Sequence, residues 1–396
     1  MKPLSPLASI GEPSPDRSLA LFRLGFRPFY LSAAVCALVS VLAWLASYTG
    51  YWESTRLNLF WHMHEMVFGF ATAVVFGFLY TAVRNWTGLW TPRGGRLAGI
   101  AALWLLGRIA MAAGPGTIAA GLDLLFIPVA IVPLLGVMLK SGKRSNLPLL
   151  GLPFLLSCAN LCFHLALLER IALSPITAVE AGLLVLAVLS TVMAGRVVPG
   201  FTKNMAPGSA PRSLARLDKA GIVLIMLSSA AWLFGLWGPL TQLLLAAAGI
   251  VQLCRLAYWQ PGRTGPYPLL WILHLAFGWI GIGYLLLALS GLGLCSASTA
   301  MHAIAIGGMS SLILGMMTRT TIGHTGRPMR AERHERLIFL AIQAAAVARV
   351  LANVLPVQLR TALLLISGAC WMLAFATFLW RFAPLLSQAR IDQREG

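Results

Sequence analysis

Long apolar segments recur along the whole chain, and each is long enough to cross a lipid bilayer. A hydrocarbon core of about 30 Å requires about 20 apolar residues in a helix. We expect twelve such segments, at roughly residues 28–48, 60–83, 97–113, 117–139, 147–168, 175–195, 220–237, 240–260, 267–291, 297–318, 337–355 and 361–380. Only 11% of the residues are charged, against about 25% in soluble domains, which excludes a soluble globular enzyme. The sequence predicts an all-α integral membrane protein of about twelve transmembrane helices.

The positive charges predict the orientation of these helices. A net charge of +18 would indicate nucleic acid in a soluble protein, but in a membrane protein the positive-inside rule explains it. With the N-terminus inside, 25 of the 30 Lys and Arg residues fall in cytoplasmic segments. We therefore expect both termini in the cytoplasm, the bilayer as a partner, and no nucleic acid partner. The expected organisation is a flexible tail (1–20), one transmembrane domain (21–385) and a second tail (386–396).

Ionisable residues inside the spans are costly and indicate function. Nine of them, from seven predicted helices, fall in the outer half of the bilayer: His62, His64, Glu65, Arg108, Asp123, His164, Glu180, His302 and Arg349. His274 lies instead toward the cytoplasmic side. The clustering predicts one polar cavity that opens outward and holds a metal or haem, because imidazole is the commonest metal ligand. The structural alternative is that these side chains hydrogen-bond across helices.

Two histidine-bearing segments repeat each other. His64, Gly69, Ala73, Gly77, Thr87 and Gly88 correspond to His302, Gly307, Ser311, Gly315, Thr325 and Gly326 at a constant offset of 238. Equivalent histidines on equivalent helices could clamp one haem, or hold one haem and one copper. His62 points about 200° away from His64 on an ideal helix, so we expect only one of them to face a given site.

Basic residues mark the cytoplasmic ends of three spans. Arg196 and Arg319 lie at two of these ends. They complement the helix dipole and the anionic leaflet, or they hold the carboxylates of a haem.

Several motifs together resemble the NnrS family. They read LFRLGFRPFYL at 21–31, WHMHEMVFG at 61–69, RNWTG at 84–88, GRVVP at 195–199 and MMTRTTIGHTGRP at 316–328. The resemblance implies a bacterial inner-membrane protein that carries haem and copper and is linked to nitric oxide metabolism and nitrosative stress. It implies no defined catalysed reaction and no assigned catalytic residue.

The ligands follow from the histidine cluster in that setting. We expect His64 and His302 to be the leading haem or copper ligands, followed by His62, His164 and His274. Glu65 and Glu180 are candidates to orient a ligand histidine or to pass protons. Arg196 and Arg319 are the candidates for cofactor carboxylates.

Two other classes of membrane protein compete with this interpretation. A secondary transporter fits twelve spans with a repeat, and Glu180, Asp123 and Arg349 could then form a substrate path. A respiratory oxidase core subunit fits less well, because the chain has no adjacent His-His pair for copper.

Overall fold

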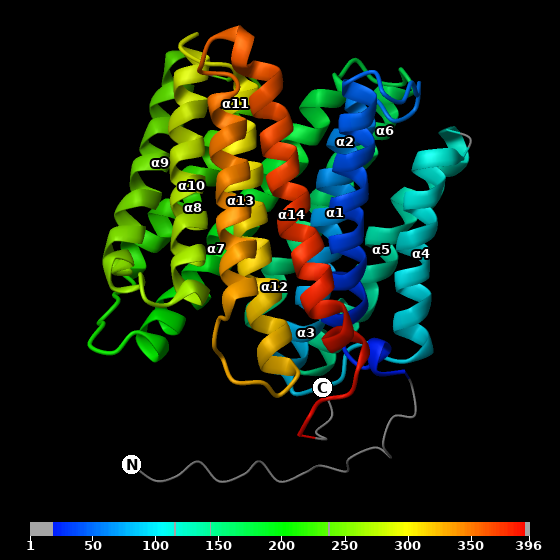
Figure 1. Ribbon diagram of the computed structural model, residues 1–396, viewed down its shortest axis with the longest axis vertical. Helices are drawn as coiled ribbons and strands as arrows, with labels where there is room; N and C mark the ends of the chain where they lie inside the picture. Colours follow the sequence, from blue (N-terminus) through cyan, green and yellow to red (C-terminus); the bar gives the residue numbers. More distant parts are fainter. Residues whose placement is uncertain (1–18, 115, 143, 237, 393–396) are drawn as a thin grey trace.

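The computed structural model describes residues 19–114, 116–142, 144–236 and 238–392, and in this part of the chain the regular structure is helical, without strands. Figure 1 shows the helices running roughly side by side. The principal helices are α1 (Phe26–Tyr48), α2 (Leu59–His64), α3 (Thr72–Thr87), α4 (Gly95–Ala113), α5 (Gly116–Lys140), α6 (Gly151–Leu167), α7 (Pro175–Met205), α8 (Ala215–Leu233), α9 (Pro239–Tyr258), α10 (Pro268–Gly291), α11 (Ala297–His302), α12 (Ser311–His324), α13 (Arg333–Leu351) and α14 (Arg360–Ser387). Most of the predicted N-terminal tail, and the last four residues of the C-terminal one, lie outside the described residues.

All twelve predicted segments coincide with helical stretches. Ten helices in the described part of the chain are long and apolar enough to cross a membrane. The two predicted spans outside this set are α8 and α13, each of which carries at least three charged residues, mostly in its first turns. The chain is thus a multi-pass helical protein of membrane type, and the count of twelve crossings stays a prediction.

Prolines and glycines set several helix boundaries, as the sequence indicates. Pro175, Pro239 and Pro268 occupy the first turns of α7, α9 and α10, where a missing N–H costs no intrahelical bond. Gly88 ends α3 in the left-handed conformation, with φ of 76°, which a glycine adopts without steric cost.

The predicted equivalence of the two histidine-bearing spans is confirmed by their local structure. Asn58 caps α2 and Ser296 caps α11. Each six-residue helix ends at its histidine and continues as a π-helix, η2 (Glu65–Ala71) or η5 (Ala303–Ser310), before α3 or α12 begins. Gly88 and Gly326 follow the two helices with φ of 76° and 78°. Caps, histidines, the starts of the π-helices and these glycines all keep the offset of 238.

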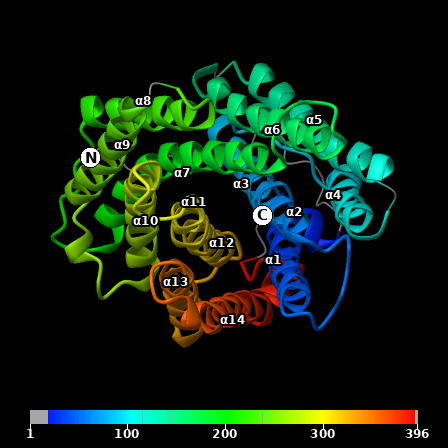
Figure 2. The same ribbon diagram turned by 90° about the horizontal axis from the view of Figure 1, so that it is seen from above.

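The repeat extends to three units of four helical spans. The units are α1 to α5, α6 to α9 and α10 to α14, with α2–η2–α3 and α11–η5–α12 each forming one span. In the first two units the second span is the longest, and in the third it has 28 residues against 31 in Val357–Ser387. These second spans are Leu59–Thr87, Pro175–Met205 and Ala297–His324. Figure 2 shows these three spans in the interior, with the other helices around them. The last helix of each unit packs against the first helix of the next, which closes the ring through α5–α6, α9–α10 and α14–α1.

The interior spans therefore position the polar residues. Ser174, the N-cap of α7, plays the same part as Asn58 and Ser296. His64, Glu180 and His302 each lie six residues after the N-cap of their span. The three units place these ionisable side chains at one register of the three central helices.

Candidate metal centre

The first central span changes its helical type next to His64. Asn58 Oδ1 accepts a hydrogen bond from Trp61 N at 3.1 Å, which starts α2 and satisfies a free N–H of its first turn. The π-helix η2 then begins at Glu65, and Thr72 Oγ1 donates to Val67 O, five residues back, at 3.0 Å. π-helical turns inside α-helices often occur at functional sites, and this one carries His64 and Glu65 at its start.

Two histidines and one aspartate converge beside this turn. His64 of α2, Asp123 of α5 and His164 of α6 are buried and each offer a ligand atom, all within 4.8 Å of one another. Asp123 Oδ2 lies 3.1 Å from His64 Nε2 and 2.9 Å from His164 Nε2. We call these three residues the His-Asp-His cluster.

A second layer of polar residues holds the cluster in place. Glu65 Oε1 lies 3.1 Å from His64 Nδ1 and accepts a hydrogen bond from Arg108 Nη1 at 3.0 Å. The other guanidinium nitrogen of Arg108 pairs with Asp123 Oδ1. Asn160 Nδ2 donates to Asp123 Oδ2 at 2.7 Å, and Asn160 Oδ1 lies 3.1 Å from His64 Nε2.

Gly69 provides the room that Arg108 needs. A Cβ atom at this position would lie 2.8 Å from Arg108 Nη1 and 2.8 Å from Glu65 Oε2. Trp104 Nε1 donates to Gly69 O at 3.1 Å, so α4 approaches η2 closely along this line. Gly69 thus admits a guanidinium, whereas a Cβ on Gly77 of the same span would meet Phe29 and Tyr30 of α1.

The hydrogen-bond pattern of His64 calls for a cation. Its Nδ1 faces a carboxylate oxygen and its Nε2 faces a carboxylate and an amide oxygen, all of them acceptors. A neutral imidazole donates from only one nitrogen, so the other nitrogen requires a second proton or a metal ion between it and its partners. Two imidazoles and a carboxylate suit a first-row transition metal, and the Glu65 carboxylate on Nδ1 is the usual partner of a ligating histidine. The donor set therefore fits a metal ion, while its complete burial leaves no face for a haem.

His62 belongs to a different cluster on the other side of the same helix. Its ring stacks on Trp44 with centroids 4.5 Å apart, and its Nδ1 is buried without a protein partner. His302 and Arg349 lie close enough to His62 to interact electrostatically. His302 Nδ1 donates to Ser298 O at 2.7 Å, and Arg349 Nη2 donates to Ser298 Oγ at 3.0 Å.

The structure therefore divides the nine predicted residues rather than gathering them in one cavity. His64, Glu65, Arg108, Asp123 and His164 form one group. His62, His302 and Arg349 form another. Glu180 belongs to neither and accepts a hydrogen bond from Trp232 Nε1 at 3.3 Å.

The remaining predicted residues lie toward the opposite end of the bundle. His274 Nε2 lies 3.0 Å from Thr202 Oγ1. Arg196 is exposed and donates to Asn146 Oδ1 at 3.0 Å. Arg319 follows His302 by 17 residues, which is roughly 25 Å of helix. That distance places Arg319 beyond the carboxylate arms of a haem ligated by His302, so we do not assign both residues to one haem.

Sequence reasoning missed Asn160 as part of the site. It precedes His164 by four residues and so shares a helix face with it. An amide on the histidine face of an otherwise apolar span was the available signal.

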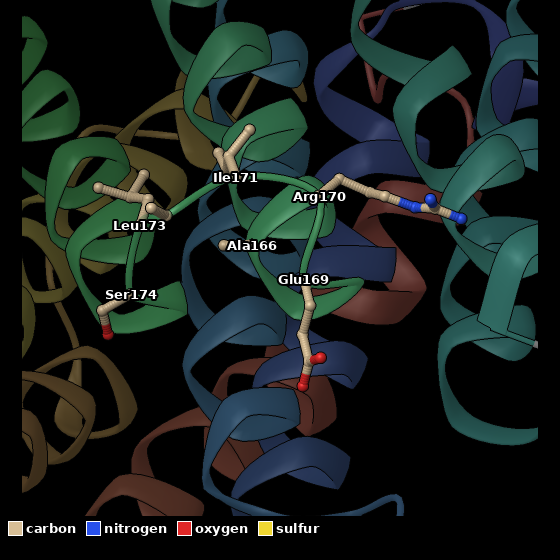
Figure 3. Close-up of a pocket in the computed structure, with 7 residues that line it drawn as sticks. Ala166, Glu169, Arg170, Ile171, Leu173 and Ser174 are labelled. Carbon is tan, nitrogen blue, oxygen red and sulfur yellow. The ribbon is translucent and has the colours of Figure 1, made fainter.

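A surface depression near the cluster is not the site itself. It has a volume of about 480 Å³ and is lined by Ala166 and residues 169–174 at the turn between α6 and α7. In Figure 3 the side chains of Glu169 and Arg170 extend in different directions. The lining offers no imidazole or thiol ligand.

Comparison with known proteins gives one match. The model of a protein family described as NnrS protein matches residues 20–390. No curated protein matches the chain.

Proposed function

The chain belongs to the NnrS family, and on that premise we propose that it binds or processes nitric oxide at a metal held by the His-Asp-His cluster. The observation that carries the proposal is the buried convergence of His64, Asp123 and His164. The family model spans nearly the whole chain, so the cluster lies inside the matched region. Nitric oxide is small and apolar and enters such a site through the lipid.

We place this protein in the bacterial inner membrane with twelve crossings and both termini in the cytoplasm. The positive-inside distribution supports this topology, since the excess of Lys and Arg alternates with the helices. The charged first turns of α8 and α13 both fall on the cytoplasmic side in this arrangement. The cluster then lies in the outer half of the bilayer.

The ion that we propose for the cluster is copper. Bound there, it would supply a redox-active centre with affinity for nitric oxide. Glu65 fixes the ring orientation of His64 through Nδ1, which leaves Nε2 as the ligand atom. Glu65 and Asp123 carry two negative charges, and Arg108 neutralises one of them. A bound cation would offset the other, so the site needs no counter-ion from solution.

The haem that we propose is ligated by His302, with His62 as the second candidate. His302 Nδ1 donates to a backbone carbonyl, so the neutral ring carries its lone pair on Nε2. This arrangement is usual for a ligating histidine. His62 presents a second imidazole in the same electrostatic neighbourhood, and Arg349 is a nearby cation for an anionic group of the cofactor.

Metal analysis and absorbance spectra of the purified protein test both assignments. We expect copper and haem in the wild type, and haem bands that shift when nitric oxide is added to the reduced sample. His64→Ala and His164→Ala should lose copper and keep the haem bands, whereas His302→Ala should lose the haem bands. His334→Ala is the matched control, because His334 packs on Trp380 away from both clusters.

Two outcomes contradict the proposal. A colourless, metal-free protein from haem-replete, copper-replete cells removes its basis. Equal copper content in the wild type, His64→Ala and His164→Ala shows that the His-Asp-His cluster is a structural hydrogen-bond network.

A further inference from the structure

Four arginines are deeply buried, and three of them have their charge offset by the protein. Arg108 meets the two carboxylates of the candidate metal centre. Arg255 Nε donates to Asp218 Oδ1 at 2.7 Å. Arg27 Nη1 donates to three carbonyls at the end of α14, where the helix dipole is negative. Arg319 differs, because no carboxylate among the described residues pairs with it.

Neutral groups alone surround the Arg319 side chain. Nη1 donates to Leu269 O at 3.3 Å and contacts Met205 Sδ at 2.9 Å. The guanidinium carbon lies 3.9 Å from the centre of the Phe201 ring. The residue is 6% exposed. A buried charge held by neutral groups is costly unless a counter-ion joins it.

Three polar atoms on the two helices that meet at this position have no hydrogen-bond partner among the described residues. Arg319 Nε, Thr318 Oγ1 and His274 Nδ1 are all buried without a hydrogen-bond partner. They come from α10 and α12, which pack against each other. Each such group in a folded protein calls for a bound water or ion, and water would satisfy the hydrogen bonds but not the charge of Arg319.

We propose that Arg319 binds a small inorganic oxyanion where α7 and α12 end and α10 begins. The guanidinium offers parallel N–H donors that match a planar oxyanion such as nitrite. The side chain is enclosed by three helices, which limits the ligand to a small ion. Leu269, which accepts a hydrogen bond from Arg319, lies in the first turn of α10, at the positive end of that helix's dipole. This site is separate from the His-Asp-His cluster and does not depend on a metal there.

Calorimetric titration of the full-length protein in detergent with sodium nitrite, against sodium chloride at equal ionic strength, tests the site. We expect saturable binding that weakens by more than about tenfold in Arg319→Gln. Arg319→Lys keeps the charge and loses the planar fork, so its affinity should fall between the two. Arg336→Gln, which removes an exposed arginine of α13, is the matched control and should bind as the wild type does.

Thermal unfolding of the same proteins gives a second readout. Nitrite should raise the unfolding midpoint of the wild type and of Arg336→Gln, and leave that of Arg319→Gln unchanged, because a ligand stabilises only the state that binds it. Two results overturn the proposal: the absence of saturable binding to the wild type, and an equal nitrite effect in wild type and Arg319→Gln. Metal content is measured on each sample, so failure of the metal centre and failure of this site are distinguishable.

Discussion

Arg108 holds two buried carboxylates, so its removal should strongly destabilise the protein. Arg108 Nη1 lies 3.0 Å from Glu65 Oε1, and its other nitrogen pairs with Asp123. In Arg108→Met both carboxylates lose their cation while each remains about 2% exposed. Removing one partner of a buried ion pair costs about 3–5 kcal/mol. The folding equilibrium constant should therefore fall by roughly two to four orders of magnitude.

The assay is reversible unfolding in mixed micelles of sodium dodecyl sulfate, followed by tryptophan fluorescence. The chain has 13 tryptophans, which gives a strong signal. Each protein is unfolded in the presence of a chelator, so that bound metal does not contribute to the free energy of unfolding. Arg196→Met is the matched control, because that side chain is exposed and makes one hydrogen bond, worth about 1 kcal/mol or less.

A triple variant distinguishes two causes of instability in Arg108→Met, namely the uncompensated charges of the carboxylates and the lost packing of the arginine side chain. If uncompensated charge is the cause, adding Glu65→Gln and Asp123→Asn to Arg108→Met should restore most of the stability. The reasoning is refuted if Arg108→Met unfolds within about 1 kcal/mol of the wild type. It is equally refuted if the triple variant is as unstable as the single one.

Four further changes give smaller, local effects. Gly69→Ala should destabilise the protein and lower its metal content, because the added methyl group overlaps the ion pair beside it. Gly99→Ala, in an open part of α4, should stabilise by about 0.5–1 kcal/mol in the same titration. Ser296→Ala removes the cap of α11 and should cost about 1 kcal/mol. Arg27→Leu removes three hydrogen bonds to the end of α14, and limited proteolysis should then cleave near residue 388 sooner than in the wild type.

Sequence predicted the helices well because hydropathy and length are properties of single segments. Each apolar run of about 20 residues has one stable conformation in lipid, so no knowledge of its neighbours is needed. The repeat between the spans at 59–87 and 297–324 was also visible, since it rests on identities at a fixed offset. The middle unit escaped detection because its central helix carries Glu180 where the other two carry histidine.

The division of the histidines could be predicted only in part. The turn of an ideal helix correctly separates His62 from His64. It cannot say which one meets Asp123 and His164, because that depends on how α5 and α6 pack against the π-helix. For the same reason depth alone placed His302 with His64, whereas His302 Nδ1 donates to Ser298 O of its own helix and His64 meets Asp123 of α5 and His164 of α6.

The three-unit ring explains why the His-Asp-His cluster lies where it does. The boundary between α9 and α10 is close-packed, since a Cβ on Gly249 would lie 2.7 Å from Gly281 O. At the boundary between α14 and α1, Gly368 packs against the Leu45 side chain in the same way. At these two contacts small and apolar residues meet, while an ionisable side chain lies elsewhere on the same helices, as Arg27 of α1 does at the end of α14.

The third boundary, between α5 and α6, instead faces His64 with Asp123 and His164. If polar contacts of this kind served only to hold neighbouring units together, we would expect them at all three boundaries between units. Among the described residues, a cluster of two histidines and an aspartate occurs at one joint, beside one of two equivalent π-helices, and this asymmetry supports our proposal that the cluster binds a metal. His302 has no carboxylate among its described contacts, which supports our proposal that His302 and His64 serve different cofactors.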